Sequence, residues 1–180
     1  MILLAETSLT TDEIELEKMD PAFRRATRNM ALATLVTEKV LESLPVHVQK
    51  DEISFVVGTH FGEIDSTLEF LHGCYELNTA RPILFQNSLH NSTLGFVSMR
   101  LGLTGPAMTV SCDRDTASAS VNLGETLLEL TPYVLVCTVD CLPKALKAEY
   151  LRAYPFIESY VDRAHCALYA RSDRTVTDEV

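Results

Sequence analysis

Three short, largely apolar runs constrain the fold of this chain most strongly. They cover residues 53–57, 107–112 and 134–139, and glycine, proline or charged residues bound them. Such runs are typical of strands buried on both faces, as in parallel sheets. Because segments with helical periodicity separate the runs, the sequence predicts an α/β fold with a mostly parallel sheet. In this fold the three runs are neighbouring strands, and helices cover both faces of the sheet.

The segments around these runs supply the predicted helices. Asp20 and Pro21 offer an N-cap and a first helical residue, so a helix is expected from about residue 21 to 43. Periodic apolar residues predict further helices over residues 62–71, 92–101, 116–130 and 144–154, and a last strand over residues 166–170. We expect a polar lead before residue 19, a loop over residues 78–82 and a frayed tail from Ser172.

Composition limits the domain organisation and the function classes. A chain of 180 residues with 47% hydrophobic content fits a single domain over residues 1–180. The net charge of −10 argues against binding to nucleic acids or anionic membranes, and we expect no basic patch. The apolar runs are too short to cross a bilayer, and the apolar start has no basic residues before it, unlike a signal peptide. We therefore expect a cytoplasmic protein without a cofactor.

The five cysteines are odd in number, scattered and mostly set in apolar runs. This pattern is typical of reduced thiols in a protein core, so we expect neither a disulfide framework nor a metal site. Cys137 and Cys141 are spaced C-x₃-C, but no second pair of cysteines or histidines accompanies them. Packing is therefore favoured over zinc binding.

Two motifs and three supporting segments point to a family. An apolar strand runs into a G-T-x-x-G turn at residues 53–62, and residues 102–110 contain a G-L-x-G-P entry into the next strand. The supporting segments are residues 20–31, 87–91 with Gly95, and 134–140. In this order they resemble the N-terminal half of β-ketoacyl synthases of the thiolase superfamily. They are most similar to the short chain-length-factor-like proteins linked to aryl polyene pigments. The resemblance covers about residues 20–140 and implies a thiolase-like half-fold with a ketosynthase as partner.

The resemblance also implies where the chemistry is incomplete. Condensing enzymes of this family use a cysteine at the turn after the G-L-x-G-P strand and two histidines in the second half of the fold. Aligned without a gap from Gly105-Pro106, this chain has Arg114 at the nucleophile position, and a guanidinium cannot carry an acyl chain. His165 lies late in the chain, but no glycine-rich motif flanks it. The resemblance therefore implies a non-catalytic protein. The alternative is a small acyltransferase, a β-ketoacyl synthase that uses Cys112 as its nucleophile.

The residues near Arg114 leave alternatives open. We expect Cys112 to be a buried thiol of the strand, because free cysteines are commonly buried and the strand is apolar. A nucleophile role would require its side chain to face an open pocket. Asp113, Arg114 and Asp115 form either an ion-pair cluster that plugs the mouth of the old pocket or a solvated loop.

The same family places two segments of this chain near a dimer interface. Residues 107–110 would lie at the edge of the sheet with unpaired backbone groups, so Ala107 and Thr109 are candidate interface residues. His90 and Asn91 either hydrogen-bond across an interface or belong to a surface loop. We expect at least a dimer, with a ketosynthase subunit or with a second copy, and an acyl carrier protein as a further candidate partner. An orphan homodimer without a pathway is the remaining alternative, because fold alone does not establish function.

Overall fold

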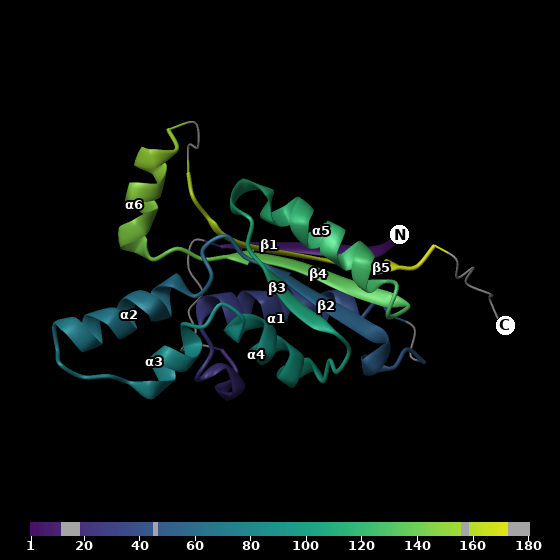
Figure 1. Cartoon of the computed structure of the whole chain (residues 1–180), viewed down its shortest axis with the longest axis horizontal. Coiled ribbons are helices and arrows are strands. Elements are labelled where there is room, and N and C mark those ends of the chain that lie inside the picture. Colours follow the sequence, from purple (N-terminus) through teal and green to yellow (C-terminus); the bar gives the residue numbers. More distant parts are fainter. Residues whose placement is uncertain (12–18, 45–46, 156–158, 173–180) are drawn as a thin grey trace.

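The computed structural model describes residues 1–11, 19–44, 47–155 and 159–172, and within them five strands form one sheet (Figure 1). The strands are β1 (Ile2–Thr11), β2 (Ile53–Gly58), β3 (Ala107–Val110), β4 (Tyr133–Asp140) and β5 (Asp162–Ala170), in the order β1-β5-β4-β2-β3. β2 pairs in parallel with β3 and with β4, which confirms that the three apolar runs are neighbouring parallel strands. β5 and β1 continue the sheet beyond β4 in antiparallel pairing.

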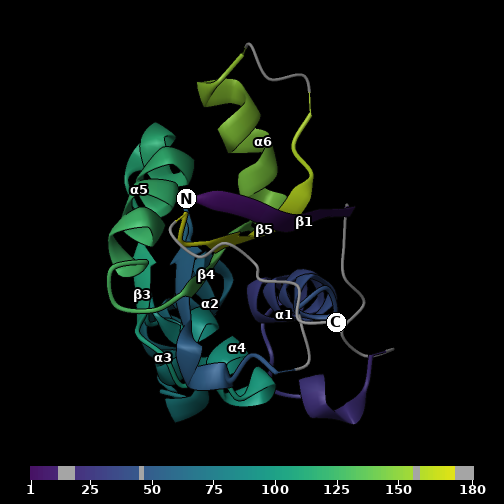
Figure 2. The same cartoon turned by 90° about the vertical axis from the view of Figure 1, so that its right-hand side faces the viewer.

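Helices cover both faces of the sheet, as predicted. The helices are α1 (Arg28–Leu41), α2 (Ile64–Tyr75), α3 (Pro82–Asn87), α4 (Ser92–Leu101), α5 (Thr116–Leu127) and α6 (Lys144–Ala153). α5 packs on β2 and β4 from one side, whereas α1 and α4 pack from the other (Figures 1 and 2). The larger core lies on the α1 side, where Leu32 and Val36 join Phe55, Leu135 and Leu168. Among the described residues, no helix is long and apolar enough to cross a bilayer.

The first helix begins later than the sequence predicts. Asp20 caps a short 3₁₀ turn, Pro21–Phe23, by accepting a hydrogen bond from a backbone N–H two residues on. α1 begins at Arg28, where the hydroxyl of Thr27 accepts a hydrogen bond from the N–H of Met30 at 3.1 Å. The threonine therefore caps the helix, because its oxygen satisfies an N–H that has no partner within the helix.

The sequence analysis missed β1 and α3. Residues 2–11 were expected to be a polar lead, but Ala5 and Leu9 pack on the core while Glu6 and Ser8 are exposed. This alternation is sufficient for an antiparallel strand with one buried face. The last predicted strand is confirmed as β5 and begins earlier, at Asp162. The rest of the expected polar lead, residues 12–18, and the tail from residue 173 lie outside the described residues.

Candidate functional site at the ends of the parallel strands

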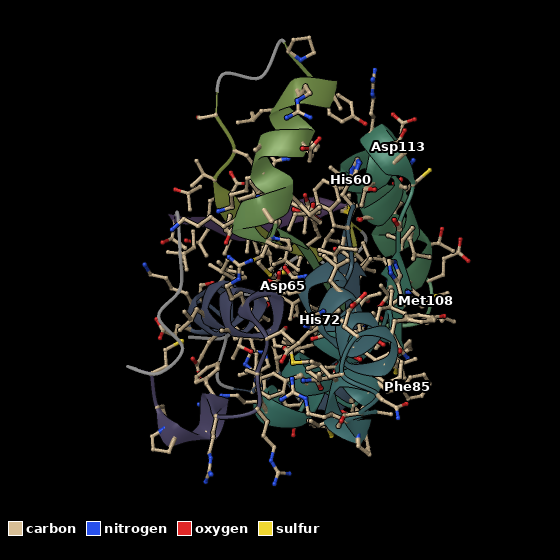
Figure 3. The ribbon with its side chains drawn as sticks, turned by 90° about the vertical axis from the view of Figure 1, so that its left-hand side faces the viewer. His60, Asp65, His72, Phe85, Met108 and Asp113 are labelled. Carbon is tan, nitrogen blue, oxygen red and sulfur yellow. The ribbon has the colours of Figure 1, made fainter. Side chains whose placement is uncertain are left out.

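The turns that follow β2, β3 and β4 meet at one end of the sheet. The chain leaves these strands at Gly58, Val110 and Asp140, and α5 begins at the same end. Ligand sites of parallel α/β sheets commonly lie outside the carboxyl ends of the strands. Figure 3 shows His60 and Asp113, from the turns after β2 and β3, on neighbouring segments at this end. Nε2 of His60 lies 3.1 Å from Oδ1 of Asp113.

Asp140 holds the turn after β2 in place. Its Oδ1 accepts hydrogen bonds from the hydroxyl of Thr59 at 3.0 Å and from the backbone N–H groups of His60 and Phe61 at 2.7 and 3.1 Å. The hydroxyl of Thr59 also accepts a hydrogen bond from the N–H of Gly62 at 2.9 Å. Burial raises the pKa of Asp140, although its hydrogen bonds act in the opposite direction. The G-T-x-x-G motif is thus a backbone turn built around a buried carboxylate.

The prediction that Cys112 is a buried strand thiol is wrong. β2 ends at Gly58, whose partner in β3 is Val110, so no strand continues alongside the chain beyond this point. β3 therefore stops two residues earlier than predicted. The backbone N–H of Cys112 donates instead to the hydroxyl of Thr116 at 2.9 Å, and its side chain is exposed.

Asp113, Arg114 and Asp115 form an exposed turn, which decides between the plug and the solvated loop in favour of the loop. Asp113 adopts a φ of +42°, which is uncommon for a residue other than glycine, and the chain turns here from β3 into α5. The guanidinium of Arg114 lies 5.6 Å from the centre of the Tyr154 ring, near the end of α6. The turn therefore borders the site without filling it.

A hollow of about 360 Å³ opens between these turns and β5. It is lined mostly by polar and charged residues: His60, Asp113, Arg114, Thr116, Ala117, Thr138, Val139, Asp140, Arg163 and His165. The late histidine, His165, reaches the hollow from β5, and its Nε2 lies 3.2 Å from Oε2 of Glu6. Both histidines of the hollow thus have a carboxylate partner, and Cys112 is not part of the lining. The arrangement suits the binding of a polar group better than acyl transfer from a thiol.

An apolar hollow adjoins the polar one beside α5. It also measures about 360 Å³, shares Ala117, Thr138 and His165 with the polar hollow, and continues along Val136 and Tyr169. The two hollows together run from the ends of the strands onto the α5 face of β4 and β5. A surface of this kind can accept a molecule with a polar head and an apolar chain.

A buried carboxylate beside the site was not predicted. Glu63 is 4% exposed and accepts hydrogen bonds from the hydroxyls of Thr27, at 3.0 Å, and Thr93. Burial raises the pKa of Glu63 to about 7, although the two hydroxyls act in the opposite direction. Glu63 therefore links the start of α1 to α4 through groups that are far apart in the sequence.

An ion-pair cluster ties β5 to the helices. The carboxylate of Asp162 is fully buried and lies 2.5 Å from the guanidinium of Arg28 and 3.1 Å from Nζ of Lys147. Arg28 also pairs with Asp65, at 2.6 Å. Buried charges of this kind are stable only when paired, so the cluster fixes the positions of α1, α2 and α6 relative to β5.

The two candidate interface residues of β3 lie on an open edge of the sheet. β3 is the last strand of the described sheet and pairs only with β2. The carbonyls of Pro106 and Val110 accept hydrogen bonds from the N–H groups of Phe55 in β2 and of Thr59 directly after it. Because backbone groups alternate in direction along a parallel ladder, Ala107 and Thr109 direct their N–H and C=O groups away from β2.

The other two candidates, His90 and Asn91, belong to a different segment of the chain from β3. Both are exposed in the turn before α4. The His90 ring lies against the turn after β2, since a Cβ added to Gly62 would be 2.8 Å from its Nδ1. The structure thus brings Ala107 and Thr109 together, but it does not bring His90 and Asn91 to the same strand.

Three of the five cysteines are buried, as predicted for core thiols. They are Cys137, Cys141 and Cys166, and burial raises the pKa of Cys141 and of Cys166. Cys74 is partly buried. Within the part of the chain that the structure describes, no three His, Cys, Asp or Glu side chains are grouped so that they could hold a metal ion.

Comparisons with known proteins identify the fold of this chain. No protein-family model matches the chain, and neither does any curated protein. A chain from the complex of the ketosynthase ApeO with its chain length factor ApeC from Xenorhabdus doucetiae does match. It has a TM-score of 0.71 and 17% identity over 88% of this chain and 64% of that chain. The chain has a ketosynthase-type, thiolase-like fold.

Two further solved structures agree with this fold. The ishigamide ketosynthase/chain length factor matches with a TM-score of 0.74 and 15% identity, over 91% of this chain and 49% of that one. The type II complex AntDE:AntF, an acyl-carrier protein with its ketosynthase, matches with a TM-score of 0.69 and 12% identity, over 94% and 62%. The chain thus spans about half to two thirds of the length of the chains it matches. The fold predicted from the sequence motifs is confirmed.

Proposed function

We propose that this chain is a non-catalytic, chain-length-factor-like partner subunit of a ketosynthase. The partnership would serve the assembly of fatty-acid or polyketide-type chains, such as aryl polyenes, in the cytoplasm. The open edge of β3 carries the proposal, because the outward backbone groups of Ala107 and Thr109 offer a partner strand ready-made hydrogen bonds.

Apolar side chains extend this edge into a larger contact surface. Met108 of β3 is 46% exposed and Phe85 of α3 is 53% exposed, and both lie on the same side of the molecule as Asp113 (Figure 3). A large exposed apolar side chain on an open strand, such as Met108, is typical of an interaction site. We assign His90 and Asn91 to the polar rim of this contact.

The fold neighbours support a ketosynthase as the occupant of this surface. Two of the matched structures are described as a ketosynthase together with a chain length factor. The polar and apolar hollows beside α5 fit a role in shaping the space for a growing acyl chain. Three buried free thiols are in keeping with a reducing compartment.

Co-purification from the native host, followed by mass spectrometry, tests the proposal. A ketosynthase recovered with the chain in a one-to-one complex is the expected result. A monodisperse monomer by light scattering, with no protein recovered, would contradict it, and a homodimer alone would favour the orphan alternative.

A pair of variants at Thr109 then tests the edge itself. Thr109→Pro removes an outward N–H without touching the hydrogen bonds to β2, so we expect at least about a tenfold loss of ketosynthase binding. Thr109→Val keeps this N–H and the shape of the side chain, and should bind like the wild type. Equal binding by both variants would show that the contact does not use the β3 edge.

One observation favours a second candidate function, a small acyltransferase that uses Cys112. The thiol is exposed and stands two residues before Arg114, near the start of α5. A cation and a helix N-terminus both favour a thiolate. Against this function, Cys112 does not line the polar hollow that holds His60 and His165.

A further inference from the structure

Two of the buried cysteines lie directly opposite each other in the sheet. Cys137 of β4 pairs with Cys166 of β5, and both side chains are fully buried in the core on the α1 side. Cys141, the third buried cysteine, directly follows β4 and lies outside this pairing. The antiparallel arrangement of β4 and β5 thus brings together two thiols that are far apart in the sequence.

The hydrogen bonds between β4 and β5 show which kind of pair this is. The N–H of Arg171 donates to the carbonyl of Pro132 at 3.1 Å, and these two residues stand opposite each other one position beyond the end of the paired strands. Hydrogen-bonded and non-hydrogen-bonded pairs alternate along an antiparallel ladder, and the register of β4 and β5 is regular. Counted from Pro132, Cys137 and Cys166 therefore form a non-hydrogen-bonded pair.

The spacing of such a pair permits a disulfide bond. Opposite residues in non-hydrogen-bonded pairs have Cα atoms about 4.5 Å apart, and disulfides join Cα atoms that are roughly 4.4 to 6.8 Å apart. The two thiols already influence each other, because burial and then contact with Cys137 raise the pKa of Cys166. A disulfide at the short end of the permitted range is strained, so it is reduced more easily than a structural one.

The pair lies beneath the two hollows beside α5. Thr138 and His165 are the next pair along the strands, and both hollows share these two residues. Successive side chains of a strand point to opposite faces, so the cysteines lie on the other face of the sheet from the hollows. A covalent link between Cys137 and Cys166 would therefore fix β4 to β5 at the place where the two hollows meet.

From these observations we infer that Cys137 and Cys166 are a modification site, a dithiol that hydrogen peroxide converts into a reversible cross-strand disulfide. The sulfur of one thiol attacks a peroxide oxygen, which gives a sulfenic acid and releases water. The second thiol attacks the sulfenic sulfur, so the S–S bond forms and a second water leaves. The peroxide takes up the two electrons, and small cellular thiols restore the dithiol by exchange.

Burial sets the rate of this reaction. The peroxide reaches the two sulfurs only when the core opens locally, and the raised pKa of Cys166 keeps the reactive thiolate scarce. The link should therefore form more slowly than oxidation of the exposed Cys112. Cytosolic disulfides are typically transient and redox-sensing, which fits a strained bond of this kind. The link needs no partner, so it stands or fails independently of the proposed function.

Peptide mapping without reduction tests the link. The full chain is treated with hydrogen peroxide in native buffer, alkylated with iodoacetamide in urea and digested. We expect two peptides joined through Cys137 and Cys166, which dithiothreitol separates. Cys166→Ala should lose this joined pair, whereas Cys141→Ala, which removes the other buried thiol, should retain it.

Two results of this mapping would overturn the inference. In the first, Cys112 is oxidised, which proves that the peroxide acted, but Cys137 and Cys166 are both fully alkylated. In the second, the joined peptides appear only when the oxidation is carried out in urea, so that the link belongs to the unfolded chain and not to the sheet.

Hydrogen exchange measures what the link does to the hollows. Thr138 and His165 form a hydrogen-bonded pair, so their amides report the separation of β4 from β5. These amides should exchange at least about tenfold more slowly in the oxidised than in the reduced wild type. Peroxide-treated Cys166→Ala should show no slowing, and Cys141→Ala should behave like the wild type. Equal exchange in oxidised and reduced wild type would contradict a link that fixes the strands beneath the hollows.

Discussion

The two edges of the sheet differ in how they meet the solvent. β1 is ten residues long, pairs in antiparallel fashion with β5, and has an irregular register between Leu3 and Ala5. Glu6, Ser8 and Thr10 line its exposed face. A bulge and polar or charged side chains are features that keep an edge strand from pairing with other chains.

β3 lacks these protective features. Its four residues include no charge, its register with β2 is regular, and Ala107 and Met108 are exposed. So short a strand offers only a few backbone hydrogen bonds. Exposed apolar side chains such as that of Met108 must therefore supply much of any contact. The comparison teaches that β1 is protected against pairing over residues 6–10, although Ile2, Leu3 and Leu4 are exposed, whereas β3 is an edge open to a partner.

The largest expected effect concerns the glycine that leads into β3. A Cβ at Gly105 would lie 2.2 Å from the carbonyl oxygen of Ile53, which belongs to backbone that cannot move aside. We expect Gly105→Ala to lower the free energy of unfolding by roughly 3–4 kcal/mol in urea denaturation. Gly95→Ala, at a helical position with open space around it, is the matched control and should raise stability by about 0.5–1 kcal/mol. Similar stabilities for the two variants would mean that β3 is not held against β2 in this way.

The helix that precedes β3 is α4, and it is held by a hydrogen bond to a carboxyl group that titrates. Thr93 of α4 bonds to Glu63, whose pKa rises from 4.5 to about 7 in the fold because of burial. A raised pKa means that the folded chain retains the proton that the unfolded chain releases. The contribution of Glu63 to stability is therefore most favourable below pH 4.5 and becomes less favourable as the pH rises to about 7. The penalty above that pH is about 3 kcal/mol.

Glu63→Gln removes this dependence. At about pH 8 the variant should be more stable than the wild type by about 2–3 kcal/mol, whereas near pH 4 the two should differ little. Urea denaturation at both values measures the difference. Glu125→Gln, at an exposed carboxylate, serves as the control and should show no such dependence. A difference in stability between Glu63→Gln and the wild type that does not increase with pH would contradict a raised pKa for Glu63.

The third prediction compares the two edges directly. Met108→Glu places a charge on the open edge and should weaken ketosynthase binding about a hundredfold, equivalent to about 2.7 kcal/mol. Ser8→Glu places the same charge on the exposed face of β1 and should change binding less than about twofold. Calorimetric titration with the co-purified ketosynthase gives both values. A larger loss of ketosynthase binding for Ser8→Glu would mean that the partner binds the β1 edge and not the β3 edge.

Features that depend on local sequence could be predicted, whereas features that depend on contacts between residues distant in the chain could not. The centre of the sheet could be predicted because β2 and β4 are local runs of mostly apolar residues, interrupted only by Ser54 and Thr138. β1 was missed because an edge strand with one polar face resembles a polar lead. The end of β3 could not be predicted, since it depends on where β2 stops, about fifty residues earlier in the chain.

The candidate site follows the same rule. The turns after β2 and β3 could be located from G-T-x-x-G and from Arg114, which are local motifs. The partners of Asp140 and Glu63 could not, because each bonds to residues about 30 to 80 positions away. A carboxylate directly after the most apolar strand was the one available signal for Asp140. His165 enters the hollow only because β5 is antiparallel to β4.

The smallest expected effect is at Cys112, the residue that follows β3 and whose exposure the sequence analysis missed. We expect no stoichiometric acyl adduct by intact-mass spectrometry after incubation with malonyl and longer acyl thioesters. The thiol lies outside the lining of the polar hollow, whose histidines pair with Asp113 and Glu6. A thiol without a converging base and oxyanion donors loses several powers of ten in rate. Iodoacetamide provides the positive control, because it should label an exposed thiol in the wild type and spare that site in Cys112→Ala. An acyl adduct that is complete on the wild type and absent from Cys112→Ala would make this edge the start of an active site, and the chain would then be an acyltransferase.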